Sequence, residues 1–147
     1  MLYIASDHAG YQLKKYLTRY LKNQLKMKAV DLGAKKFDKD DDFPDFAIPL
    51  AKKVATGENN LGILICGTGH GVCMTANKVA GGRAILGYSI EGAEMGRKHN
   101  NANILCLAGR VLSEEHAAAM VKKFLETKFD GAERLVRRIK KIEALEK

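Results

Sequence analysis

Cysteine is scarce in this sequence, and long apolar runs are missing from it. The three cysteines are an odd number without a C-x-x-C pair, which argues against a disulfide framework and a zinc site, so we expect free thiols. No apolar run approaches the roughly 20 residues that a membrane-spanning helix needs. The opening stretch MLYIASDHAG lacks the basic, apolar and small-residue regions of a signal peptide. The sequence therefore predicts a soluble, cytoplasmic protein with no membrane partner.

Acidic residues are too few to balance the basic ones. The chain has 25 lysines and arginines against 17 aspartates and glutamates, a net charge of +8, which can indicate a nucleic-acid partner. The basic residues are scattered, however, and their densest cluster, 134–141 (RLVRRIKK), has no interleaved aromatic residue and is followed by Glu143 and Glu146. Such runs are typical of solvated helix faces, so we expect no nucleic acid among the partners.

The order of apolar segments predicts one α/β domain spanning residues 1–147, with no linker dividing it. Five short, mostly apolar runs resemble buried parallel strands: 2–6, 28–32, 61–66, 83–87 and 103–108. Helix-like segments lie between and after them: 8–25, 44–57, 90–101, 113–131 and a C-terminal helix at about 131–147. This alternation predicts right-handed crossovers and a parallel sheet covered on both faces. The acidic stretch 33–43 (GAKKFDKDDDF) is expected to be an exposed connection.

Chemically active side chains stand where the predicted strands end. Open parallel sheets bind ligands beyond the carboxyl ends of their strands. The first strand is followed by Asp7 and His8, the third ends at Cys66, and the helix after the fourth ends at His99 and Asn100. If the first and third strands are neighbours, Asp7, His8 and Cys66 converge at one edge. An acid, an imidazole and a thiol at that edge form a candidate active site.

The glycine-rich loop after Cys66 has the spacing of neither nucleotide-binding motif. GTGHG at 67–71 satisfies neither G-x-G-x-x-G nor the triphosphate loop. Alternating glycines can instead turn successive backbone N–H groups toward one point at a helix start, where they bind an anion and favour a thiolate. In this arrangement the backbone of His70 matters more than its ring. A thiolate beside such a nest suits a reaction that forms an enediolate.

Simpler explanations exist for the remaining cysteines and histidines. Cys73 and Cys106 fit ordinary core packing, since cysteine is among the most buried residue types. His116 lies in a helical segment and is expected at the surface. His99 could be no more than a favourable charge at the end of a helix, an alternative that its position alone leaves open.

Six sequence motifs together resemble the ribose-5-phosphate isomerase B family, which includes the galactose-6-phosphate isomerases. They are SDHAG (6–10), DFPDFA (42–47), GILICGTGHG (62–71), ANKVAGGRA (76–84), KHNNANIL (98–105) and GRV (109–111). The resemblance covers essentially the whole chain. It implies a Rossmann-like three-layer α/β/α sandwich with a five-stranded parallel sheet. It also implies a homodimer or homotetramer whose active sites are shared between subunits, with no metal and no cofactor.

The resemblance also implies a role for each matching residue. Cys66 would be the base that moves a proton between C2 and C1 of an open-chain sugar phosphate, assisted by Thr68, and His99 would open the furanose ring. The enediolate would be held by the loop backbone at Gly67, Gly69, His70 and Gly71. The sugar and its phosphate would be contacted by Asp7, His8, Asn100, Arg110, Arg134 and Arg138. A second branch of the family replaces the cysteine by a glutamate after the loop, where this chain has Val72, so the chain fits the cysteine branch.

Two departures from the family pattern leave alternatives open. The segment 131–135 (GAERL) has one extra residue and no histidine, and 86–96 (LGYSIEGAEMG) differs from the commoner form. We expect an isomerase of ribose 5-phosphate and ribulose 5-phosphate, as in the pentose phosphate pathway. A six-carbon phosphosugar (galactose or allose 6-phosphate) is the alternative substrate. A non-catalytic, flavodoxin-like binding domain is the alternative class.

Overall fold

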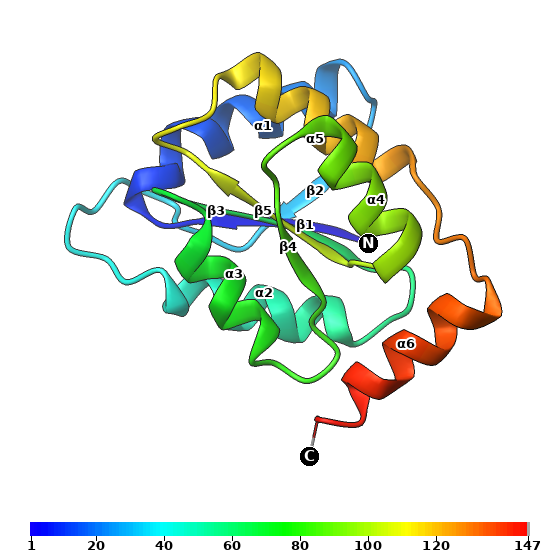
Figure 1. The fold of residues 1–147 in the computed structure, drawn as a ribbon. Helices are drawn as coiled ribbons and strands as arrows, with labels where there is room; N and C mark the ends of the chain where they lie inside the picture. Colours follow the sequence, from blue (N-terminus) through cyan, green and yellow to red (C-terminus); the bar gives the residue numbers. More distant parts are fainter. Residues whose placement is uncertain (147) are drawn as a thin grey trace.

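The computed structural model describes residues 1–146 and contains a five-stranded parallel sheet between two layers of helices (Figure 1). The strands are β1 (Leu2–Ser6), β2 (Ala29–Asp31), β3 (Leu61–Cys66), β4 (Ala84–Leu86) and β5 (Ile104–Ala108). Their order across the sheet is β2-β1-β3-β5-β4. The helices are η1 (His8–Gly10), α1 (Tyr11–Asn23), α2 (Pro44–Ala55), α3 (His70–Asn77), α4 (Ile90–Asn100), α5 (Glu114–Glu126) and α6 (Glu133–Glu143). The predicted three-layer α/β sandwich is confirmed.

Two apolar cores, one on each face of the sheet, hold the layers together. Helices α1, α4 and α5 cover one face, where Leu17 and Phe124 pack against β3 residues such as Ile63. Helices α2 and α3 cover the other face, where Leu50 packs against Leu64. Because β3 lies between both cores, its side chains are apolar on both faces, as expected for a central parallel strand.

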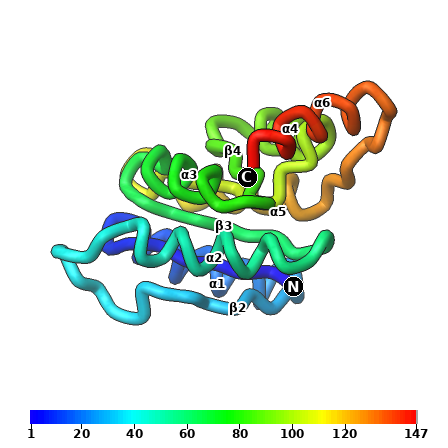
Figure 2. The backbone as a smooth tube through the Cα atoms, turned by 90° about the horizontal axis from the view of Figure 1, so that it is seen from below, coloured from blue at the N-terminus to red at the C-terminus, as the bar shows by residue number. Residues whose placement is uncertain are grey.

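Helix α6 lies apart from this sandwich, beyond the β4 edge of the sheet (Figure 2). Its buried residues are Leu135 and Ile139. An ion pair between Arg83 and Glu143, 3.5 Å long, and a hydrogen bond from the Gly81 N–H to Glu146, 3.0 Å long, tie its end to the turn before β4. Among residues 1–146, no helix is long and apolar enough to cross a bilayer.

The last predicted helices differ from the observed ones in length. The segment predicted as a helix over 113–131 is helical only to Glu126, because Thr127 adopts an extended backbone. The chain then crosses to α6, and the N–H of Asp130 donates to the carbonyl of Lys98 at 3.0 Å. The C-terminal helix predicted at about 131–147 spans Glu133–Glu143.

Candidate active site

The carboxyl ends of β1 and β3 lie side by side, as the candidate site requires. The register pairs Ser6 with Ile65, and the N–H of Asp7 donates to the carbonyl of Ile65 at 3.3 Å. Asp7 and Cys66 therefore follow adjacent strands at the same edge. The buried Asp7 carboxylate accepts the N–H of Gly10 at 3.1 Å, which fixes the turn that carries His8.

The glycine-rich loop wraps closely around the Cys66 thiol. Cys66 is only 4% exposed, and its Sγ accepts the N–H of Gly69 at 3.2 Å. Gly69 has a φ of 78°, and a Cβ there would lie 2.7 Å from Leu86 Cδ1, so only glycine suits this position. Helix α3 begins at the next residue, His70. The loop thus directs a backbone donor at the sulfur and leads directly into a helix start.

The first turn of α3 provides further backbone donors. Its first N–H groups have no acceptor within the helix, because α-helical bonds begin four residues along. The first such bond here runs from the N–H of Cys73 to the carbonyl of Gly69. The N–H of His70 is engaged only by Thr68 Oγ1, at 3.5 Å. Val72, in the same turn, is buried in the core. This helix start can receive an anion beside the thiol.

Arg110 lies at the same loop. Its backbone N–H donates to the carbonyl of Gly67 at 3.0 Å, and the N–H of Gly109 donates to the carbonyl of Cys66 at 2.8 Å. A methyl group on Gly67 would lie 3.3 Å from Arg110 Nη1. The guanidinium therefore stands over the glycine loop, where it can neutralise an anionic ligand.

The other two thiols lie behind the site. Cys106 is fully buried on β5, and burial, followed by contact with Cys73, raises the pKa of its thiol well above the ordinary value. A hydrogen bond with Cys106 lowers the pKa of the Cys73 thiol. Core packing describes Cys106, whereas Cys73, on α3, is half-buried. Neither stands between a strand end and the glycine loop as Cys66 does.

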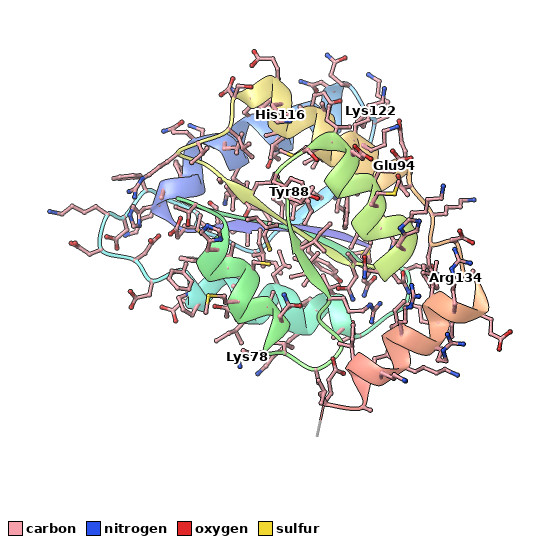
Figure 3. All side chains as sticks on the ribbon, viewed as in Figure 1. Lys78, Tyr88, Glu94, His116, Lys122 and Arg134 are labelled. Carbon is pink, nitrogen blue, oxygen red and sulfur yellow. The ribbon has the colours of Figure 1, made fainter. Side chains whose placement is uncertain are left out.

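Four predicted site residues lie away from Cys66. Helix α4 runs back across the sheet and leads into β5, so His99 and Asn100 lie near its amino edge. The β3–β5 register runs from Gly62–Ile104 to Cys66–Ala108, and four residues of parallel strand span ~13 Å. Arg134, with Arg138, lies on α6 at the outside of the molecule (Figure 3). Within one chain these residues do not meet the thiol.

Comparison with known proteins assigns this chain to a family. A family model described as Ribose/Galactose Isomerase matches residues 2–142. The chain belongs to this family. A Mycoplasma genitalium protein described as probable ribose-5-phosphate isomerase B is 48% identical, over 99% of this chain and 95% of its own. Ribose-5-phosphate isomerase B of Mycobacterium tuberculosis is 39% identical, over 94% of this chain and 85% of its own.

Solved structures of ribose-5-phosphate isomerase B have the same fold as this member of the ribose/galactose isomerase family. The M. genitalium enzyme with bound ribulose-5-phosphate superposes with a TM-score of 0.93, at 47% identity, covering 99% of this chain and 95% of its own. The Thermotoga maritima enzyme gives a TM-score of 0.92 at 40% identity, covering 97% of both chains. The family and fold predicted from the motifs are confirmed.

The sequence did not point to one residue at the carboxyl edge, Asp41. The acidic stretch 33–43 is largely exposed, as expected, but the Asp41 side chain is only 10% exposed and lies against His8, with Asp41 Oδ1 2.6 Å from His8 Nδ1. Burial raises the pKa of the neighbouring Asp7 carboxyl, an effect that the Gly10 N–H opposes. The one available signal was that Asp41 directly precedes the DFPDFA motif.

Asp7, His8 and Asp41 are also the residues to consider for a metal ion. Within residues 1–146 they form the single cluster of this kind, with ligand atoms within 4.8 Å of one another. The short Nδ1–Oδ1 contact is a hydrogen bond, and it occupies the nitrogen of His8 that faces the carboxylate. The cluster therefore suits hydrogen bonding to a hydroxyl-rich ligand better than coordination of a cation.

Proposed function

We propose that the protein interconverts ribose 5-phosphate and ribulose 5-phosphate through an enediolate, with Cys66 as the base. The observation that carries this proposal is the Cys66 thiol, which is buried at the sheet edge with the Gly69 N–H on its sulfur and Asp7 and His8 on the adjacent strand end. The M. genitalium relative, whose structure contains ribulose-5-phosphate, supports the choice of a five-carbon sugar phosphate.

The proposed reaction moves one proton between the two carbons and one between their oxygens, and it needs no oxidant. The Cys66 thiolate removes the proton from C2 of the open-chain aldose, and the C2–H electron pair forms a C1–C2 double bond as the C1 carbonyl becomes an oxyanion. The free N–H groups at the start of α3 hold that negative charge. The thiol then returns the proton to C1, and the C2 hydroxyl loses its proton to O1 as the C2 carbonyl forms. Arg110 lies close enough to Gly67 to bind an anionic group of the sugar phosphate.

We further propose that a second copy of the chain completes each site. Cys66, Thr68 and Arg110 come from one protomer, whereas His99, Asn100 and the α6 arginines come from its partner, because their own chain holds them at the other end of the sheet. Exposed apolar side chains near the carboxyl edge support an interface there: Met74 is 68%, Tyr88 73% and Val111 73% exposed. Tyr88 lies on the turn between β4 and α4 (Figure 3).

Two experiments test these proposals. The first incubates the protein with ribose 5-phosphate and a chelator, follows ketose formation, and repeats the assay with allose and galactose 6-phosphate. Faster turnover of a six-carbon substrate would select the alternative isomerase, and absence of turnover with all three would favour a binding domain. The second co-expresses Cys66→Ala with His99→Asn. In a two-fold dimer with shared sites, random pairing restores about a quarter of the wild-type activity on ribose 5-phosphate. Sites complete within one chain would restore none.

A further inference from the structure

His8 is attached to the acidic connection before α2 by two hydrogen bonds to one oxygen, one from its main chain and one from its ring. Asp41 Oδ1 accepts the backbone N–H of His8 at 3.0 Å and lies 2.6 Å from Nδ1 of its ring. The ring also has Phe37 edge-on, with 6.2 Å between centroids. Both Asp41 and Phe37 come from the stretch 33–43, far from His8 in sequence. This connection therefore fixes both the main chain and the side chain of His8.

Asp41 is positioned to act on His8 as a buried charge. Its side chain is only 10% exposed, so solvent screens its interactions weakly. Its second oxygen, Oδ2, is buried and has no hydrogen-bond partner among residues 1–146. A buried carboxylate with one free oxygen is costly, because that oxygen has lost water without gaining a donor.

The Asp41 contact decides which nitrogen of neutral His8 carries the proton. A carboxylate oxygen can only accept, so Nδ1 must be protonated to bond Asp41. The neutral ring then has Nε2 unprotonated, as an acceptor for a hydroxyl. In a neutral histidine without such a partner, neither nitrogen is fixed as the protonated one, because the tautomer is set by the hydrogen bonds of the ring.

We propose that Asp41 is a positioning residue of the sugar site, which holds His8 in the Nδ1-protonated tautomer so that Nε2 accepts a sugar hydroxyl. The effect on turnover rests on the proposed isomerase function, but the tautomer does not. Asp40 provides a matched control, because it is an adjacent, exposed aspartate on the same connection.

The first measurement is a long-range ¹H–¹⁵N spectrum of the four imidazoles, recorded above the ordinary titration range of histidine, with His8 assigned from a His8→Gln variant. We expect a protonated Nδ1 and an unprotonated Nε2 for His8 in the wild type and in Asp40→Asn. Asp41→Ala should shift the population toward the other tautomer. An unchanged His8 tautomer in Asp41→Ala would overturn the proposal even if ribose 5-phosphate is the substrate.

The second measurement is kcat and KM for ribose 5-phosphate. Asp41→Ala should lose roughly 10- to 100-fold in kcat/KM, as expected for a hydrogen bond to a charged group. Asp41→Asn keeps an acceptor oxygen for the Nδ1 proton and should recover part of the loss, and Asp40→Asn should match the wild type. Thermal unfolding establishes that both Asp41 variants fold. A changed tautomer with unchanged kinetics would overturn the positioning role, whereas an inactive wild type would overturn the proposed function and leave the spectrum to decide on Asp41.

Discussion

The Sγ atom of Cys66 accepts a hydrogen bond from the backbone N–H of Gly69, at 3.2 Å. Only two residues separate them within one tight loop, so the donor on the sulfur is held there by the backbone and not by a mobile side chain. A sulfur with a fixed donor and a helix start beside it is suited to carry negative charge.

Cys66→Ala should reduce turnover of ribose 5-phosphate by roughly 10²- to 10⁴-fold, the usual contribution of a general base. Binding should persist, because the backbone donors remain. Cys73→Ala is the matched control, since Cys73 lies on α3 and not at the junction of strand and loop. Near-normal turnover in Cys66→Ala, measured beside the control, would refute the assignment.

His99→Asn should affect the two directions of the reaction differently. The aldose is mainly a furanose ring, so its conversion becomes limited by spontaneous ring opening when the imidazole is removed. Ribulose 5-phosphate has no such ring and should retain much of its activity. The measurement is the initial rate in each direction, with Asn100 left intact. Equal losses would contradict a role in ring opening.

Arg134 and Arg138 lie four residues apart on α6 and so share one face, with ~6 Å between their Cβ atoms. Both side chains are exposed in the single chain. This is what we expect of residues that reach into the site of a partner subunit. Replacing either by alanine should lower kcat/KM for ribose 5-phosphate roughly 10- to 100-fold, with a smaller effect on unphosphorylated ribose. Arg137→Ala should change little, and the reverse ranking would show that the extra residue near Glu133 turns another face toward the phosphate.

Gly69→Ala should destabilise the protein more than Gly131→Ala. Both glycines have a positive φ, 78° and 73°, so alanine at either should cost about 1–2 kcal/mol. A Cβ at Gly69 would also meet Leu86 Cδ1 at 2.7 Å, whereas none of the described atoms lies within 4 Å at Gly131. Urea unfolding of both variants measures the difference. Equal losses of unfolding free energy in the two variants would mean that the loop at Gly69 accommodates the added methyl group without further cost.

Asp7→Asn should stabilise the fold at neutral pH while impairing the site. Burial raises the pKa of Asp7 in the folded protein, so the folded state binds its proton more tightly than the unfolded state does. This group's contribution to stability is therefore largest below its ordinary pKa of 3.8 and is lost as pH rises through the folded pKa. Asparagine does not ionise, so the Asp7→Asn variant does not lose this stability. The difference in free energy of unfolding between the variant and the wild type should therefore grow from acid toward neutral pH. An advantage independent of pH, in unfolding curves of both proteins, would contradict this origin.

Much of the fold was predictable because buried parallel strands are short apolar runs, and the predicted core of each strand matches the structure. That Asp7 and Cys66 lie at the same edge of the sheet was predictable too, once β1 and β3 were taken as neighbours. The helix predicted over 113–131 was too long, because the backbone is already extended at Thr127, and the segment that follows contacts Lys98 on α4 through Asp130.

The sequence by itself determined the strand and helix alternation, the family, and the junction of Cys66 with its glycine loop, because these depend on residues close together in the chain. Only the tertiary structure decided that Asp41 lies on His8, 33 residues away, and that His99 and α6 lie away from the thiol. The first depends on how an irregular connection folds over a sheet edge, which no periodicity encodes. The second depends on the direction of α4 across the sheet, since a helix that leads into a parallel strand must end at the edge opposite the one where that strand ends.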